Sequence, residues 1–371
     1  MSSAKQTVRE VGALVSNVVD AGKGLLPWEL PQSVLGRLRR AAPPPHSEYL
    51  MFVERDFGRS ARYLSNVLVP TLQRAGPLWV PSALRRLFFH ETTIQHSPDH
   101  LGSYDSFPVE HWFFINGILT DAGMAGWNAA YLARIFHRPF TIVQNATDGP
   151  LADLLECADE KAFGMNGEPA DIAFPEIHRA LKDPTKDRVV IIAHSQGTLI
   201  TAVLLRLLRL VYARAGEVIS EAKQAEELEA LRRTGVTVDL DDFSDVTTDE
   251  LRRLEIYCFA NCASEVRYVD PGLALPWIES FGNEHDLVAR LGMLAPDLKA
   301  ENIAIDGPLW VRPGGWGHLL NHHYLRAIEL AQGGGLTPGP TTTTADPFEL
   351  YGGGEAHAPR LFTYVNGGQP G

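Results

Sequence analysis

Cysteine and long apolar runs are scarce in this sequence of 371 residues. The three cysteines are a small, odd number, which does not indicate a disulfide framework. Cys258 and Cys262 fall in a predicted strand, which favours small core side chains over metal or redox groups. No run of 18 apolar residues occurs, so we expect no transmembrane helix. Residues 1–23 lack the apolar stretch and cleavage pattern of a signal peptide, which favours a cytoplasmic protein.

Positive charge is also in short supply. The chain has 33 Lys and Arg against 45 Asp and Glu, a formal net charge of -12. Binding to phosphate groups needs clustered Lys and Arg, so this balance argues against nucleic acid as the main partner. Residues 78–90 mix Trp, Phe and Arg, which allows contact with a membrane surface. A helix that packs on the main domain is the favoured interpretation of that segment.

The histidines form no metal-binding pattern. His318 and His322 have a helical spacing that can bind a metal, but an H-E-x-x-H pattern is absent and Glu329 is poorly placed to help. Another histidine-rich stretch without metal spacing comprises His90, His96, His100 and His111. We therefore expect no catalytic metal and no cofactor.

The pattern of apolar and polar residues changes at Val109. Residues 1–108 are predicted to form a mainly helical extension, broken by the prolines at 43–45. Beyond it, short apolar runs alternate with amphipathic helices, a pattern typical of strands buried on both faces of a parallel sheet. The runs are 111–117, 138–145, 188–194, 254–261 and, more weakly, 277–282, and the helix candidates are 124–137, 151–163, 175–182 and 197–214. The pattern predicts a doubly wound α/β architecture for residues 109–332.

Two further segments depart from this alternation. Residues 215–253 contain a charged helix and an acidic loop, and they form either a lid over a site or a solvated helical decoration of the sheet. Residues 333–371 are rich in Gly, Pro and Thr and are predicted to be a flexible tail. No internal repeat is visible.

The most informative segment is RVVIIAHSQGTLITAVLLRLL (188–208), in which a buried strand leads through Ser195 into a long helix. A serine at such a turn is held in a strained conformation with its hydroxyl presented for reaction. The segment resembles the nucleophile elbow G-x-S-x-G of the α/β-hydrolase superfamily, with Ala193 in place of the first glycine. The resemblance implies that Ser195 is a nucleophile and that the backbone N–H of Gln196 helps to bind an oxyanion. The alternative is an ordinary helix-capping serine.

An earlier strand supplies a candidate for the second oxyanion donor. HWFFINGILTD (111–121) ends in Asn116 and Gly117, where the superfamily commonly has a His-Gly pair. By this resemblance the backbone N–H of Ile118 is the second donor, with Leu119 as the next candidate. The alternative is a plain Asn-Gly turn.

A serine nucleophile needs a base and an acid that orients it, and in this superfamily the chain order is Ser, acid, His. Asp286 in SFGNEHDLVARLG (280–292) resembles the acid of many lipases and esterases, with Glu284 and Asp270 as rivals. A helix N-cap is the alternative role for Asp286.

The base should follow near the end of the fold. His318 comes after a Gly-rich loop and before a predicted helix, as the superfamily's histidine commonly does. His322 and His323 fall inside that helix, where a side chain is less free to reach the serine.

These residues predict a serine hydrolase that cleaves a carboxylic ester or a lipid through an acyl-enzyme on Ser195. Its partner would be a small-molecule substrate. Two alternatives remain: a non-catalytic α/β-hydrolase relative that binds a small ligand or a protein, and a lipid-surface protein with vestigial chemistry.

Overall fold

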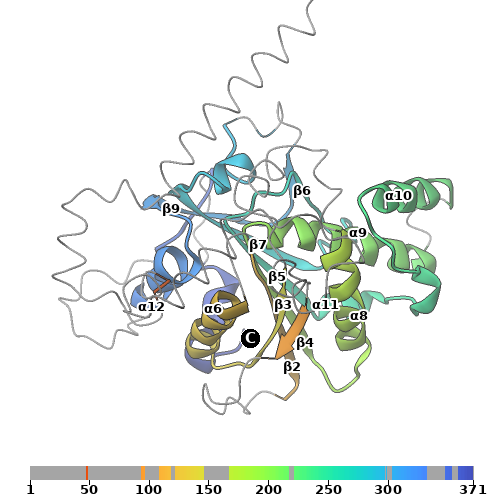
Figure 1. Cartoon of the computed structure of the whole chain (residues 1–371), viewed down its shortest axis with the longest axis horizontal. Helices are drawn as coiled ribbons and strands as arrows, with labels where there is room; N and C mark the ends of the chain where they lie inside the picture. The colour runs from red at the N-terminus through yellow and green to blue at the C-terminus, as the bar shows by residue number, and fades with distance from the viewer. Residues whose placement is uncertain are drawn as a thin grey trace, which may run out of the picture.

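The structure is a computed structural model (Figure 1). It describes residues 47–48, 93–96, 108–117, 122–145, 167–216, 221–296, 298, 303–331, 347–352 and 358–370. Several predictions fall outside these residues: the helix at 151–163, the segment 78–90, most of the N-terminal extension, and Ile118 with Leu119.

The core of the fold is an eight-stranded sheet in the order β1-β3-β2-β4-β5-β7-β9-β10. Its six inner strands run parallel, and only the edge strands β1 and β10 are antiparallel to their neighbours. The strands are β1 (Thr93–His96), β2 (Glu110–Ile115), β3 (Phe140–Gln144), β4 (Arg188–His194), β5 (Leu254–Phe259), β7 (Trp277–His285), β9 (Leu309–Trp316) and β10 (Glu349–Leu350). A separate pair joins β6 (Glu265–Val266) and β8 (Ala304–Ile305).

Helices cover both faces of this sheet (Figure 1). One face packs against α8 (Gly167–Lys182) and α9 (Gly197–Gly216), and the other against α6 (Ala122–Phe136) and the segment η6–α12 (Leu320–Leu325 and Arg326–Ala331). Side chains alternate along each strand, so in β4 Val189 and Ile191 join the first core while Val190 and Ile192 join the second. This arrangement confirms the predicted doubly wound, mostly parallel α/β-hydrolase type of fold.

The strands that the sequence did not predict include β1 and β9. Residues 93–96 were assigned to a helical extension but form the edge strand β1, with Thr93 opposite Gln144 and His96 opposite Thr141. Residues 309–316 were expected to include a Gly-rich loop but form β9, which lies parallel to β7. In both places pairing with a neighbouring strand satisfies the backbone, which outweighs the local sequence preference.

The predicted flexible tail is wrong for residues 347–352 and 358–370. Phe348 and Leu350 pack on the core at β10, and Leu361, Phe362 and Tyr364 are buried against the face that α6 covers. These apolar side chains are spaced among the Gly and Thr residues that suggested flexibility, and their burial orders the segment.

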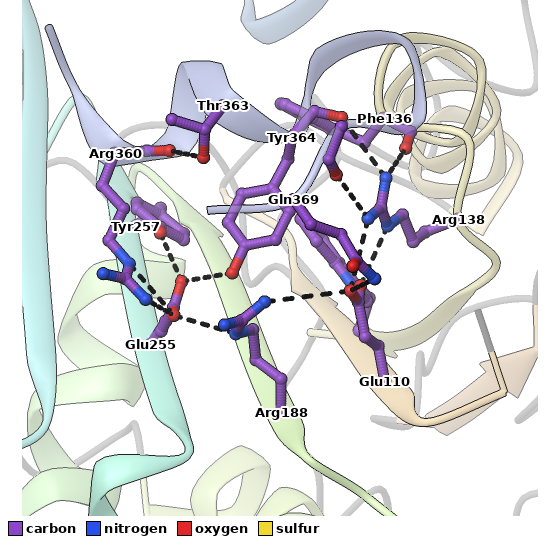
Figure 2. Close-up of polar contacts among 12 residues, drawn as sticks. Glu110, Phe136, Arg138, Arg188, Glu255, Tyr257, Arg360, Thr363, Tyr364 and Gln369 are labelled. Carbon is purple, nitrogen blue, oxygen red and sulfur yellow. Dashed lines mark hydrogen bonds and ion pairs between the residues drawn. The ribbon is translucent and has the colours of Figure 1, made fainter. Parts of the chain in front are cut away.

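A buried polar network fixes the same segment to the amino ends of the strands (Figure 2). Glu255 of β5 accepts hydrogen bonds from Arg360 (2.8 Å) and from the Tyr364 hydroxyl (2.7 Å). Arg138 pairs with Glu110 at 2.9 Å and donates to the Gly368 carbonyl at 2.7 Å. Each buried charge therefore has an oppositely charged partner, as burial of charge requires.

The insertion predicted at 215–253 includes α10 (Glu221–Arg233), the turn η4 (Leu240–Asp242) and α11 (Thr248–Arg252). Of these elements, α10 packs against α9, and α11 packs against α8 and β5. In Figure 1, α10 lies at the edge of the molecule, away from the sheet. Asp171 of α8 accepts the Thr237 N–H at 2.6 Å, and Lys182 pairs with Glu250 at 2.7 Å.

Replacing Leu361 by alanine should lower the free energy of unfolding by about 2 to 5 kcal/mol, because it leaves a cavity in the core. The matched control is Leu273, which is 50% exposed; Leu273→Ala should change that free energy by at most about 0.5 kcal/mol. Chemical denaturation of both variants measures the difference. Equal, small effects would contradict the packing of the C-terminal segment.

Candidate active site

Ser195 lies at a cramped turn between β4 and α9. Its φ is 57°, a conformation that is uncommon for a residue with a side chain. At the start of α9, a Cβ on Gly197 would lie 2.3 Å from the Ile115 carbonyl oxygen. A Cβ on Gly117 would lie 2.5 Å from the Ser195 Cβ. Both positions therefore need glycine, and the ends of β2 and β4 hold the serine tightly between them.

His318 is the imidazole next to this serine. It follows β9 and precedes η6, and its Nε2 lies 2.8 Å from the Ser195 Oγ. The side chain is mostly buried, with 12% of its surface exposed. The neighbouring histidines contact other groups: His322 Nδ1 lies 2.9 Å from the Ser47 hydroxyl, and His323 Nδ1 accepts the Leu319 N–H at 2.9 Å.

Asp286 is the carboxylate that contacts His318. It lies just after β7, with Oδ2 2.9 Å from His318 Nδ1. Its carboxylate also accepts the Tyr324 hydroxyl at 2.6 Å and the Val288 N–H at 2.9 Å. The two rivals lie elsewhere: Glu284 accepts the Gly314 N–H, and Asp270 accepts the Tyr212 hydroxyl. The structure therefore brings Ser195, His318 and Asp286 into one hydrogen-bonded chain.

The protonation of this chain follows from the carboxylate. Burial raises the pKa of Asp286, but the charge and hydrogen bond of His318 and the hydroxyl of Tyr324 outweigh it and lower the pKa below its usual value. An ionised carboxylate only accepts hydrogen bonds, so His318 Nδ1 carries the proton. In the neutral form of His318, Nε2 is then an acceptor, and the Ser195 hydroxyl donates to it.

A chain of amides links the three segments around the predicted oxyanion donors. The Asn116 Oδ1 accepts the Asn145 N–H at 2.7 Å, and the Asn145 side chain donates to the Gln196 Oε1 at 2.7 Å. These contacts join the ends of β2 and β3 to the residue after Ser195. Gln196 is buried at the start of α9, where backbone N–H groups favour negative charge. Ile118, the predicted second donor, lies outside the described residues.

Sequence reasoning missed three side chains of this site. Asn145 ends the apolar run of β3 at the same sheet edge as Ser195, and its polar side chain at that position was an available signal. Tyr324 follows His318 within η6, without a pattern that marks it. His194 contacts His318 directly, and its signal was the alternation of side chains along β4.

The described residues contain no group of three His, Cys, Asp or Glu side chains arranged to hold a metal ion. Burial lowers the pKa of His322 to about 4 and that of His323 to about 3, so both rings are neutral at physiological pH. Within the same residues, no helix is both long and apolar enough to cross a membrane.

Neither the protein-family models nor the curated proteins include a match to this chain. Among solved structures, it is similar to esterase B from Lactobacillus rhamnosis, with 14% identity, a TM-score of 0.32, and 79% of this chain and 89% of that chain covered. A structure of that esterase with a C4-C4 SN3 tributyrin phosphonate matches at 13% identity and a TM-score of 0.33, over 79% and 89% of the two chains. A C6-C4 SN3 inhibited form matches at 13% identity and a TM-score of 0.32, over 78% and 90%.

Gly117→Ala should lower the free energy of unfolding by about 1 to 3 kcal/mol, because the added methyl group forces Ser195 and its backbone to move. Gly126 in α6 is the matched control, since nothing lies within 4 Å of a Cβ built there. Gly126→Ala should raise the free energy of unfolding by about 0.5 to 1 kcal/mol. Denaturation of Gly117→Ala and Gly126→Ala compares them, and equal stabilisation of both would contradict the close approach of β2 and Ser195.

Proposed function

We propose that this protein is a serine hydrolase that cleaves a carboxylic ester, including a lipid ester, through an acyl-enzyme on Ser195. The observation that carries the proposal is the hydrogen-bonded chain from Ser195 Oγ through His318 to Asp286, at a strained turn before a helix. A serine hydroxyl is a weak nucleophile, and a base within hydrogen-bond reach is what activates it.

In the first stage, His318 Nε2 removes the Ser195 proton while the oxygen attacks the ester carbonyl. The backbone N–H groups of Gln196 and Ile118 bind the oxyanion that forms. The bond to the alcohol then breaks, and His318 returns its proton to the leaving oxygen. An acyl group remains on Ser195.

In the second stage, His318 takes a proton from water, and the resulting hydroxide attacks the acyl carbon. The same N–H groups stabilise the second oxyanion. Collapse releases the carboxylic acid and returns the proton to Ser195. Asp286 keeps the Nδ1 proton in place and favours the charged form of His318 in both stages. No step needs a cofactor.

We assign this chemistry to residues 109–332. Strand β10 extends the sheet at its edge, and residues 358–370 pack on the face that α6 covers. Carboxylic esters are the proposed substrate class because the polarised carbonyl and the alcohol leaving group match the base, acid and oxyanion donors of the site. The described part of the insertion at 215–253 packs against α8, α9 and β5, and the proposed mechanism uses none of its side chains.

A fluorophosphonate probe should label the purified protein at Ser195, because the probe captures serines activated by a base. Peptide mass spectrometry identifies the labelled residue. Ser195→Ala and His318→Ala should abolish labelling, whereas Ser244→Ala, at an exposed position, should label like the wild type. A folded wild type that resists the probe would contradict the proposed hydrolase.

Asp286→Asn should reduce kcat for a hydrolysed model ester by about 10⁴-fold, because an asparagine favours the wrong tautomer of the base. Tyr324→Phe keeps the carboxylate and loses one hydrogen bond to it. Tyr324→Phe should therefore reduce kcat much less than Asp286→Asn does. Steady-state kinetics on a panel of nitrophenyl esters measures both, and equal losses would contradict the role given to Asp286.

A further inference from the structure

We propose that His194 is a positioning residue that holds the base His318 next to the nucleophile Ser195. The proposal rests on the function proposed above and adds a second histidine to that site. His194 takes no part in the proton transfers.

The alternation of β4 explains how His194 comes to face the base. Ala193 points into the core beneath α9, together with Val189 and Ile191. Val190 and Ile192 point to the opposite face, and His194 continues their row. That face is the one covered by η6 and α12, which follow His318 in the chain. The residue before the nucleophile therefore points toward the segment that carries the base.

His194 makes two contacts with His318. Its Nε2 lies 2.9 Å from the His318 carbonyl oxygen, and the two imidazole rings lie 4.8 Å apart between centroids at an angle of 31°. The first contact fixes the main chain of the base, and the second supports its ring. One residue earlier, Asn283 donates to the Gly317 carbonyl at 2.9 Å. Hydrogen bonds to two consecutive carbonyl groups therefore hold the main chain at His318.

The hydrogen bond defines the state of the His194 ring. A carbonyl oxygen only accepts, so Nε2 carries the proton and Nδ1 does not. Burial, together with the nearby charge of His318, lowers the pKa of His194 to about 3. The ring therefore stays neutral at physiological pH. A neutral neighbour does not repel the imidazolium that His318 becomes when it takes the serine proton, whereas a charged one 4.8 Å away would.

His194 also reaches the residue that orients the acid. Its ring meets that of Tyr324 edge-on, with centroids 6.3 Å apart, and the Tyr324 hydroxyl donates to Asp286. One buried side chain next to Ser195 in the chain thus contacts the base and the hydrogen-bond donor to the acid. These contacts link the positions of all three reacting groups.

His178 in α8 provides a matched control for an ordinary buried histidine. It is also buried, its Nε2 lies 2.8 Å from the Ser244 carbonyl oxygen, and its ring packs edge-on against Phe243. It therefore has the same kind of contacts as His194, but it lies on the other face of the sheet, away from His318.

The experiment compares His194→Phe and His194→Gln with His178→Phe and His178→Gln. Phenylalanine keeps a ring and removes the donor, while glutamine restores an amide donor without the ring. Two quantities are measured for each folded variant. The first is the fluorophosphonate reaction at Ser195, separated into the half-saturating probe concentration and the maximal labelling rate. The second is the low-field NMR signal of the proton between His318 Nδ1 and Asp286.

We expect His194→Phe to lower the maximal labelling rate by roughly 10- to 100-fold, since a shift of about 1 Å at a reacting group can cost about 100-fold. The half-saturating concentration should change little, and the low-field signal should broaden or disappear. His194→Gln should recover part of the rate and of the signal. Both His178 variants should keep the rate and the signal of the wild type, even where they lose stability.

Wild-type rates and an unchanged low-field signal in both His194 variants would overturn the positioning role. The NMR signal also separates this proposal from the hydrolase reaction, because it reports the hydrogen bond of His318 whether or not Ser195 reacts. If the wild type resists the probe, loss of the signal in His194→Phe and its retention in His178→Phe still support the role of His194. Retention of the signal in His194→Phe would then overturn it.

Discussion

The close approach of the ends of β2 and β4 is the constraint on which the site depends. Gly197 places α9 against the last carbonyl of β2, and Gly117 leaves room for Ser195 beside it. This contact imposes the positive φ of the serine and aims its hydroxyl across the sheet edge. His318 and Asp286 follow β9 and β7, whose carboxyl ends lie beside that of β4. The hydrogen bond between His318 and Ser195 forms because this turn holds the serine hydroxyl beside the imidazole.

The local patterns of the sequence were sufficient to find the three side chains that the fold brings together. A buried strand, a serine and a long helix define the turn at Ser195 within a few residues. Asp286 and His318 each lie at the end of a late strand, so the order of elements along the chain located them. The alternation of apolar strands and amphipathic helices was likewise enough for the doubly wound sheet, because buried parallel strands carry a distinctive continuous apolar run.

The sequence did not reveal features that depend on partners far along the chain. The edge strand β1 and the strand β9 are stabilised by pairing with β3 and β7, and neither carries a strong apolar run. Leu361 and Tyr364 lie among residues typical of flexible segments, and only the complementary surface beneath them orders the segment. The alternation of side chains along β4 indicates the face of the sheet on which His194 lies, but not its contact with His318, 124 positions further along the chain.

The C-terminal segment has a consequence for how this chain folds during synthesis. Tyr364 and Arg360 contact Glu255 across 109 and 105 residues, and Gln369 contacts Glu110 across 259. Residues 358–370 leave the ribosome after every strand that they cover. Until then the apolar face beneath Phe362 and Tyr364 is open, and Glu255 lacks two of its hydrogen-bond donors. A nascent chain that stalls before this segment exposes an apolar face of the sheet. Such a surface favours aggregation and is the kind that chaperones bind.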